Sequence, residues 1–311
     1  MSQRVKVILN PYSNRGGAGR DADVLSAALN AGGVAADVVL TQKSGDGVEL
    51  ARQAKLDGYD VIGAAGGDGT VNEVVNGIAQ ATPEGEIVGP LAVFPMGSGN
   101  DFSDMASLPR GLVESARIVH AGHTRDIDLC RATVHEESRE FTRYFDNNMG
   151  AGFEAQVTVE SRKITRLRGV AIYLWAVVRA LRQYDQPHFD VAWTEADGQV
   201  HQVSQRSLLI TLGNSRRTGG GFFMTPDALM DDGLLDMGIA QSLNTPRILA
   251  LLPRVMAGTH RNHPAMRFVR CTSVCIATKM PVPVHTDGEI LSTEAIGLSA
   301  QVLPGRLRVL C

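Results

Sequence analysis

The sequence predicts two domains of different class: a doubly wound parallel α/β domain over residues 1–129 and a β-rich domain, of sandwich type, over residues 130–311. Strand-like apolar runs alternate with helical patterns in the first part, which is typical of a parallel sheet covered by helices. After residue 129 the strand-like segments follow one another with few helices between them. A chain of 311 residues is long enough to bury two hydrophobic cores.

The first domain is predicted from short apolar segments, each followed by a polar or glycine-rich loop. A helix with apolar residues at positions 71, 74, 75 and 78 follows the third strand. Its strands are expected at residues 5–9, 34–40, 61–65 and 91–94, with another helix at 46–57. In such a sheet, ligands bind beyond the carboxyl ends of the strands.

The second domain is predicted from alternating apolar residues and one long helical stripe. Strands are expected at residues 144–151, 189–193, 200–211, 234–240, 266–277 and 296–303, and a helix at 162–183. The start of that helix carries Arg162, Lys163, Arg166 and Arg168, which form either a solvated face or a contact for lipid headgroups. A last strand at 307–310 either returns to the first domain or closes the second.

Composition places the chain among ordinary globular proteins. Hydrophobic residues make up 44%, charged residues 20%, and the net charge of −3 gives no electrostatic support for a nucleic-acid partner. The cysteines at 130, 271, 275 and 311 form no CxxC pair, so we expect reduced thiols. With no recognisable signal peptide or membrane-length apolar run, we expect a cytoplasmic protein.

The central motif is Gly66-Gly67-Asp68-Gly69-Thr70, between a buried strand and a helix. Glycines let the backbone approach a ligand closely, and a helix N-terminus attracts anions, so the arrangement suits a phosphate. Thr70 and Glu73 have the spacing of a capping box. Asp68 would repel a phosphate unless a cation lies between them, which predicts a magnesium-bound nucleotide; a glycine turn with a solvated aspartate is the simpler alternative.

Two further loops follow predicted strands of the same domain. Residues 10–20 form a polar loop with three glycines and two arginines, and residues 95–102 form a proline- and glycine-containing turn. Since all three loops fall at carboxyl ends of strands, they predict one shared binding site.

The second domain contains an acidic glycine turn, which includes Asp231, Asp232, Gly233 and Asp236. Such residues often only cap a loop. A tight turn can also aim backbone carbonyls and one carboxylate at a hard cation, so a metal site is the sharper hypothesis.

A second acidic motif, His285-Thr286-Asp287-Gly288-Glu289, follows an extended, proline-containing stretch. If the segment stays extended, Asp287 and Glu289 point to the same face. A hairpin turn is the alternative, and it explains Asp-Gly well. Phosphoryl transfer to an alcohol needs a carboxylate that accepts the hydroxyl proton. Glu289 is the candidate for this role, and His285 is a weaker one.

The ordered set of motifs resembles the diacylglycerol kinase catalytic-domain family, including its bacterial lipid kinases. The resemblance covers nearly the whole chain: the loop at 10–14, GGDGTVN, PMGSGNDF, FDNNMGAGF, the GGG to DDG segment and HTDGE. Asn14 stands where that family usually has glycine, and Ser98 where it has threonine. The fold implied is NAD kinase/diacylglycerol kinase-like, with the active site in the cleft between the domains.

The resemblance also implies roles for individual residues. Glu289 would accept the proton, Asp287 would support it, Asp68 would handle the magnesium of ATP, and Asp101 would face the acceptor. A structural Mg²⁺ would bind the side chain of Asp232 and the carbonyls of Leu229 and Leu234. The nucleotide would contact Asn10, Pro11, Tyr12, Ser13, Asn14, Thr41, Gly66, Gly67, Asp68, Gly69, Thr70, Val71, Asn72 and Ser98.

The predicted activity is phosphorylation of a lipid hydroxyl by ATP, with transient contact to a membrane surface. The alternatives are an NAD kinase-like phosphotransferase, which shares the GGDGT loop, and a nucleotide-binding regulator without turnover. The sequence leaves the acceptor lipid and the oligomeric state open.

Overall fold

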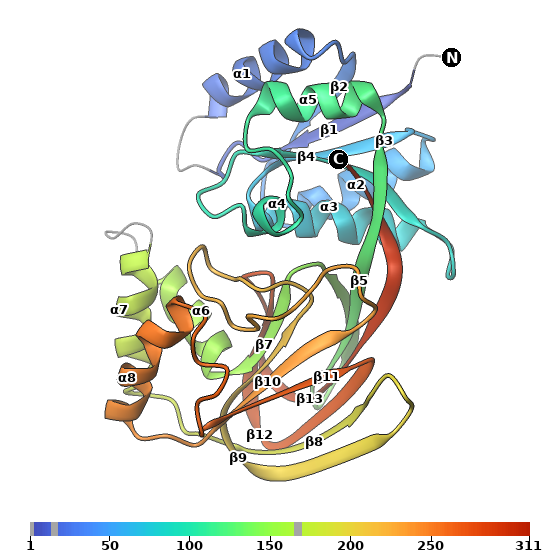
Figure 1. Cartoon of the computed structure of the whole chain (residues 1–311). Coiled ribbons are helices and arrows are strands. Elements are labelled where there is room, and N and C mark those ends of the chain that lie inside the picture. The colour runs from blue at the N-terminus through green and yellow to red at the C-terminus, as the bar shows by residue number, and fades with distance from the viewer. Residues whose placement is uncertain (1–2, 14–17, 165–169) are drawn as a thin grey trace. The chain divides into compact units, whose positions relative to one another are not determined.

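The computed structural model describes residues 3–13, 18–164 and 170–311. The chain forms two compact units, Met1–Leu129 with Pro304–Cys311, and Cys130–Leu303. Figure 1 shows the first unit in blue to green with the red C-terminal end, and the second in green to red.

The first unit is built on a parallel sheet in the order β2, β1, β3, β4 and the end of β13. These strands are β1 (Val5–Leu9), β2 (Ala36–Leu40), β3 (Val61–Gly66), β4 (Val88–Pro95) and β13 (Glu289–Leu310). Helices α1 (Ala18–Ala31) and α5 (Leu112–Ala121) cover one face, and α2 (Asp46–Leu56) and α3 (Asp68–Ala81) the other (Figure 1). The predicted doubly wound fold is confirmed.

Two features hold the first unit together: the close packing of two helices and the pairing of the last strand. A Cβ on Gly77 would lie 2.2 Å from the carbonyl oxygen of Val48, so glycine permits the close packing of α3 on α2. The C-terminal end of β13 runs parallel to β4, with Leu307 opposite Val88 and Val309 opposite Leu91. The last residues of the chain therefore belong to the first unit.

The second unit consists mainly of antiparallel strands that bend and change partners. The first half of β9 pairs with β8, while its second half lies between β7 and β10. In the same way, β12 pairs with β8 at its start and with β7 at its end. The strands are β5 (Thr124–His135), β6 (Glu140–Phe145), β7 (Asn148–Gly152), β8 (His188–Thr194), β9 (Val200–Gly213), β10 (Leu235–Gln241), β11 (Met266–Cys271) and β12 (Ser273–Thr286). The predicted β-rich domain is confirmed.

The helices of this unit differ from the prediction. The expected helix at 162–183 is wrong in its bounds: α6 (Phe153–Arg162) ends where it should begin, α7 (Val170–Ala180) ends three residues early, and residues 165–169 lie outside the described residues. The stripe of apolar residues at helical spacing correctly predicts a helix over α7. In α6, β-branched and polar residues interrupt the helical spacing of apolar residues, so no helix is predicted there. Helix α8 (Thr245–Met256) was not predicted, although Asn244 accepts a hydrogen bond from the Arg247 N–H and caps it.

These three helices cover part of the sheet (Figure 1). Phe153 of α6, Val177 of α7 and Leu251 of α8 meet in a buried apolar cluster with Leu208 and Leu209 of β9. Within the described residues, no helix is both long and apolar enough to cross a bilayer.

Candidate active site

The predicted nucleotide loops of the first unit lie at the carboxyl ends of β1, β2, β3 and β4. The side-chain amide of Asn10, after β1, donates a hydrogen bond of 3.1 Å to Thr70 Oγ1, in the first turn of α3. A Cβ on Gly66 would lie 2.3 Å from Thr70 Oγ1 and 2.8 Å from Ser13 Oγ. Asn10, Ser13, Gly66 and Thr70 therefore lie close together, and a larger residue at position 66 would have to displace the side chain of Thr70 or Ser13.

The third loop packs on the second through glycine backbone. A Cβ on Gly97 would lie 2.4 Å from the Cα of Gly67. Asn100 adopts a left-handed conformation, and its side chain bonds both the N–H and the carbonyl of Gly97 at 3.0 and 2.9 Å. This closes the turn that presents Ser98, whose side chain is exposed.

Asp68 links the two loops. Its Oδ1 accepts a hydrogen bond of 2.9 Å from the Phe102 N–H, at the start of α4 (Asp101–Met105). Burial, together with the negative charge of Asp101, raises the pKa of Asp68, while the backbone N–H of Phe102 acts in the opposite direction. A carboxylate in such a place is stabilised by a cation, as a magnesium-bound phosphate would supply.

The expected capping box is wrong. The N-cap of α3 is Gly67, and no side chain caps it. The carboxylate of Glu73 instead accepts hydrogen bonds from the Gly45 and Gly47 N–H groups at 2.8 and 2.9 Å, at the N-terminus of α2. Glu73 therefore joins α3 to α2, which leaves the first turn of α3 without a carboxylate from position 73.

The other expected nucleotide residues lie around these contacts. Thr41 is buried after β2, and its N–H donates to the Leu9 carbonyl at 2.9 Å. Tyr12 is 66% exposed, with its N–H on the side-chain oxygen of Asn10. Pro11 lies between Asn10 and Tyr12. The first turns of α3 contain Gly69, Val71 and Asn72. Asn14 lies outside the described residues.

In the second unit the Asp-Gly pair forms a two-residue hairpin between β12 and β13, so of the two alternatives left open by the sequence the hairpin turn is confirmed. Thr286 pairs with Glu289, and Asp287 and Gly288 have φ of 48° and 80°. These are the dihedral signs of a type I′ turn, which Asp-Gly favours. Residues 287 and 289 therefore do not share a face by strand alternation.

The hairpin directs the two carboxylates differently. Asp287 is buried, and its carboxylate accepts hydrogen bonds from the N–H groups of Asp146, Asn147 and Asn148 at 2.8 to 3.0 Å. Glu289 is about one-third exposed, and its Oε2 accepts a 2.7 Å bond from Arg162, which also reaches the Gly288 carbonyl. Asp287 thus holds the turn, while Glu289 remains accessible.

The basic cluster expected at 162–168 is only partly described. Arg162 pairs with Glu289, and Lys163 pairs with the buried carboxylate of Glu160 at 2.5 Å. Arg166 and Arg168 lie outside the described residues. The Arg162–Glu289 contact could not be predicted from the sequence because the two residues are 127 positions apart.

A pocket within the second unit lies beside this hairpin. Its volume is about 110 Å³, and apolar side chains of α6, α7, α8 and β9 form most of its wall. Its polar lining residues are Glu154, Thr158, Thr218 and His285, and Gly288 of the hairpin also lines it. Neither Glu154 nor the pocket gave a signal in the sequence, because the lining residues come from separate segments.

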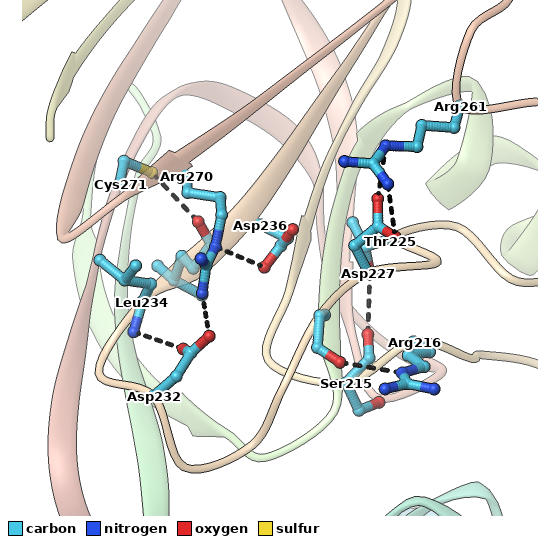
Figure 2. Close-up of polar contacts among 12 residues, drawn as sticks. Ser215, Arg216, Thr225, Asp227, Asp232, Leu234, Asp236, Arg261, Arg270 and Cys271 are labelled. Atoms are coloured by element: carbon cyan, nitrogen blue, oxygen red, sulfur yellow. Dashed lines mark hydrogen bonds and ion pairs between the residues drawn. The ribbon is translucent and has the colours of Figure 1, made fainter.

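In the acidic turn of the second unit, Asp232 and Asp236 both lie close to the guanidinium of Arg270 (Figure 2). Asp232 accepts a 3.0 Å bond from the Leu234 N–H and pairs with Arg270. Asp236 lies 3.8 Å from Arg270 Nε, and its buried Oδ2 has no hydrogen-bond partner among the described residues. Burial raises the pKa of Asp236 to about 6, with Asp232 adding to the effect and Arg270 opposing it.

The buried oxygen of Asp236 that lacks a partner among the described residues is a donor of the kind that a hard cation prefers, and Leu229 is 43% exposed. Arg270 already contacts the carboxylate of Asp232, so a cation would share that group with the guanidinium. In the described residues, no three His, Cys, Asp or Glu side chains are arranged to hold a metal ion by themselves.

Comparison with known proteins identifies the family. Residues 4–132 match the diacylglycerol kinase catalytic domain, and residues 147–311 match the YegS C-terminal NAD kinase beta sandwich-like domain. A diacylglycerol kinase of Staphylococcus carnosus (strain TM300) is 30% identical over 93% of this chain and 89% of its own length. This chain belongs to the diacylglycerol kinase family. It is a lipid kinase, and ATP is its phosphoryl donor.

Further relatives of the kinase agree with this placement. A diacylglycerol kinase of Staphylococcus aureus (strain bovine RF122 / ET3-1) is 29% identical over 93% of this chain and 87% of its own length. The crystal structure of a diacylglycerol kinase from Bacillus anthracis str. Sterne has a TM-score of 0.70 at 22% identity, covering 99% of this chain and 96% of that one. Yeast NADH kinase complexed with NADH shares the fold with a TM-score of 0.53 at 11% identity, over 100% of this chain and 83% of that one.

Proposed function

We propose that this lipid kinase transfers the terminal phosphoryl group of ATP to the hydroxyl of diacylglycerol or a closely similar lipid. The observation that carries the acceptor assignment is the apolar pocket of the second unit, which shares Gly288 with the Asp-Gly-Glu hairpin. A hydrocarbon chain gains free energy in such a pocket in proportion to the apolar area that it buries. The curated relatives that are named diacylglycerol kinase support the same acceptor.

The nucleotide would bind at the carboxyl edge of the first sheet. The first turn of α3 offers backbone N–H groups and a partial positive charge to phosphate oxygens. Asn10, Ser13 and Thr70 would line the phosphate site, and Ser98 would contact it from the neighbouring turn. The full set is the one that the sequence predicts: Asn10, Pro11, Tyr12, Ser13, Asn14, Thr41, Gly66, Gly67, Asp68, Gly69, Thr70, Val71, Asn72 and Ser98.

Asp68 would hold the magnesium ion that accompanies ATP. When bound, such an ion neutralises charge on the phosphates and orients them for transfer. The position of Asp68 between the two glycine loops, beside Asp101, gives the site the negative charge that a magnesium ion requires.

Glu289 would accept the proton of the attacking lipid hydroxyl. In this step the hydroxyl oxygen bonds to the terminal phosphorus, the bond to the ADP oxygen breaks, and the proton passes to the carboxylate. Glu289 Oε2 is held by Arg162, so we assign the proton to Oε1. Asp287 would support this group by fixing the hairpin through its three backbone hydrogen bonds.

A second cation, a structural Mg²⁺, would bind at the acidic turn through Asp232 and the carbonyls of Leu229 and Leu234. The orphaned Asp236 oxygen beside Arg270 supports this assignment (Figure 2). Membrane contact would be transient and would place the exposed Leu174 and Trp175 of α7 and Leu249 of α8 at the lipid surface.

The deciding experiment incubates the chain with γ-labelled ATP, magnesium and either diacylglycerol in detergent micelles or NAD. Label should appear in phospholipid and not in NADP. Glu289→Gln is the negative control for adventitious kinase. Label in NADP would replace the lipid assignment by the NAD kinase-like one, and no label in either would favour a nucleotide-binding regulator.

A further inference from the structure

Arg162 connects the end of α6 to the Asp-Gly-Glu hairpin, and the proposed mechanism uses it only to hold Glu289. Its Nη2 donates hydrogen bonds to Glu289 Oε2 at 2.7 Å and to the Gly288 carbonyl at 3.1 Å. The side chains of Arg162 and Glu289 are 48% and 36% exposed. This pair therefore lies at a surface that a ligand can reach.

A single nitrogen of the guanidinium makes both contacts. An arginine side chain carries five N–H donors in a planar fork. Within the described part of the chain, Nε and Nη1 of Arg162 donate no hydrogen bond. Guanidinium groups bind phosphate oxygens through such donors, and these charge-assisted hydrogen bonds are stronger than neutral ones. Arg162 can thus bind a second anion while it still contacts Glu289.

Two neighbouring cations have a different role. Lys163 and Arg179 both pair with the buried carboxylate of Glu160, at 2.5 and 2.7 Å, and the second pair joins α7 to α6. The partner of Arg162 is instead the residue that accepts a proton in the proposed reaction. The charge opposite Arg162 therefore changes during turnover, whereas the charge opposite Lys163 and Arg179 does not.

The place of Arg162 beside the apolar pocket suits a lipid headgroup. Gly288, whose carbonyl it contacts, lines that pocket. A Cβ on Gly288 would meet no atom within 4 Å, so the space beside the hairpin is open. A lipid whose hydrocarbon chain lies in the pocket can therefore place its polar end next to Arg162.

Proton transfer removes the charge that neutralises the guanidinium. As a base, Glu289 acts in its ionised form. In the proposed reaction the lipid hydroxyl oxygen bonds to the terminal phosphorus, the bond to the ADP oxygen breaks, and the hydroxyl proton passes to Glu289 Oε1. Glu289 is then neutral, and a new phosphate group is formed next to it. The positive charge of Arg162 becomes available at the moment when that phosphate needs a counter-ion.

We propose that Arg162 is a catalytic residue that binds the phosphate group of the phospholipid as it forms beside Glu289. Its guanidinium stabilises the Glu289 carboxylate before the transfer and the phosphate of the product after it. The ligand class is a phosphomonoester at the polar end of a lipid. Of the two roles that the sequence leaves open for Arg162, this is the headgroup contact. The inference rests on the proposed function for the assignment of Glu289 as the base.

The test measures binding without ATP, so that it does not depend on turnover. Dihexanoyl phosphatidic acid and dihexanoylglycerol, which lacks the phosphate, are titrated separately in submicellar solution by isothermal calorimetry. Glu289→Gln imitates the neutral side chain that follows proton transfer. Phosphatidic acid should bind this variant about tenfold or more tightly than the original chain, while dihexanoylglycerol binds both equally. Unchanged or weaker binding of phosphatidic acid to Glu289→Gln would overturn the proposal.

This gain in affinity should depend on Arg162. Adding Arg162→Gln to Glu289→Gln should reduce the gain to less than about threefold, and Arg162→Lys should keep only part of it, because an ammonium group lacks the planar fork. The matched control adds Arg139→Gln, since Arg139 is 62% exposed in the same unit and pairs with Glu136 at 2.6 Å. A gain that survives Arg162→Gln, or that disappears in the control, contradicts the proposal. Thermal unfolding of each variant checks that it remains folded.

Inorganic phosphate distinguishes a headgroup site from a site for free phosphate. It should bind Glu289→Gln at least about tenfold more weakly than dihexanoyl phosphatidic acid does, because it buries no hydrocarbon chain in the pocket. Equal affinities would contradict a lipid ligand.

Failure of this role and failure of the lipid kinase assignment are distinguishable. Phosphorylation of diacylglycerol by the original chain, without tighter binding of phosphatidic acid to Glu289→Gln, would leave the function intact and remove the role of Arg162. Tighter binding that depends on Arg162, without any lipid phosphorylation, would retain the phosphate site and remove the acceptor assignment.

Discussion

Glu289 and Asp287 are adjacent acidic residues with different surroundings, and this difference predicts different losses. Glu289 is accessible and paired with Arg162, so Glu289→Gln removes a base without removing a buried contact. We expect kcat on diacylglycerol to fall by about 10²–10⁴ with unchanged ATP affinity and thermal stability. Steady-state kinetics and a melting curve measure this, with Glu140→Gln as an exposed control in the same unit. Full turnover of Glu289→Gln would mean that another group accepts the proton, and His285 would be the next to replace.

Asp287→Asn should act mainly on stability. Its carboxylate accepts three backbone N–H bonds, and an amide can turn only one oxygen toward them. The loss should be about 1–3 kcal/mol in the free energy of unfolding, measured by denaturant titration. A variant as stable as the original chain would show that the turn does not depend on these bonds.

Asp68→Ala should abolish activity while the fold remains. The pKa of this carboxyl is raised by burial and by Asp101, so the native state disfavours its ionised form and does not need it for stability. The activation barrier should rise by about 3–4 kcal/mol, the scale of one preorganised electrostatic contact. Kinetics with magnesium-ATP measure the effect on activity, and a thermal melt measures the effect on stability. Turnover close to that of the original chain would show that Asp68 is not part of the active site.

At the scale of elements, the acidic turn predicts a dependence of stability on both magnesium and pH. Magnesium should raise the melting temperature of the original chain more than that of Asp232→Ala, because an ion that binds only the native state stabilises it. The pKa of Asp236 is raised from 3.8 to about 6, so the stability that this group contributes is present below pH 3.8 and is lost as pH rises through 6. Asp236→Asn should therefore gain stability relative to the original chain between pH 4 and pH 7. Equal melting curves with chelator and with magnesium would exclude a structural ion at this turn.

Exposed apolar side chains of helices α7 and α8 allow a test of the proposed membrane contact. Trp175 and Leu249 are 50% and 43% exposed, on helices that also line the apolar pocket. Replacing both by alanine should weaken binding to anionic vesicles and raise KM for lipid presented in them, with little effect on KM for ATP. Val200→Ala is the matched control, since Val200 is 71% exposed in the strand β9. Vesicle sedimentation measures the binding, and unchanged sedimentation of the double variant would place the contact elsewhere.

The same elements show what a sequence can predict. The sequence predicts that the glycine loops after β1, β3 and β4 meet, and they do, because local chain order determines which loops lie at the carboxyl edge of a parallel sheet. The predicted capping box of Thr70 and Glu73 is wrong because the hydrogen-bond partners of Glu73, Gly45 and Gly47, lie at the start of another helix. The sequence gives no sign of Glu154 or of the pairing of Arg162 with Glu289 for the same reason: only the folding of distant segments brings these residues to His285 and Glu289.

At the scale of the whole molecule, the two units are not successive pieces of the chain. The last eight residues, Pro304–Cys311, complete the first unit, although residues 130–303 intervene. Leu307, Val309 and Leu310 are buried there, and Arg308 forms two hydrogen bonds of 2.7 and 2.8 Å with Asp126. A chain cut at residue 129 therefore lacks part of its own core.

This connection predicts the effect of shortening the chain. Deleting residues 304–311 removes three buried apolar side chains, each stabilising by about 1.5–3 kcal/mol, which together approach the whole stability of a typical domain. We expect the nucleotide-binding unit to unfold, with loss of ATP binding and a lower first melting transition. Deleting only the exposed Cys311 is the control, because it removes one backbone hydrogen bond to His123 and no core side chain. Should the shorter chain bind ATP with unchanged affinity in calorimetry, the parallel pairing of β13 with β4 would not be needed to form the phosphate site, and the first four strands would suffice by themselves.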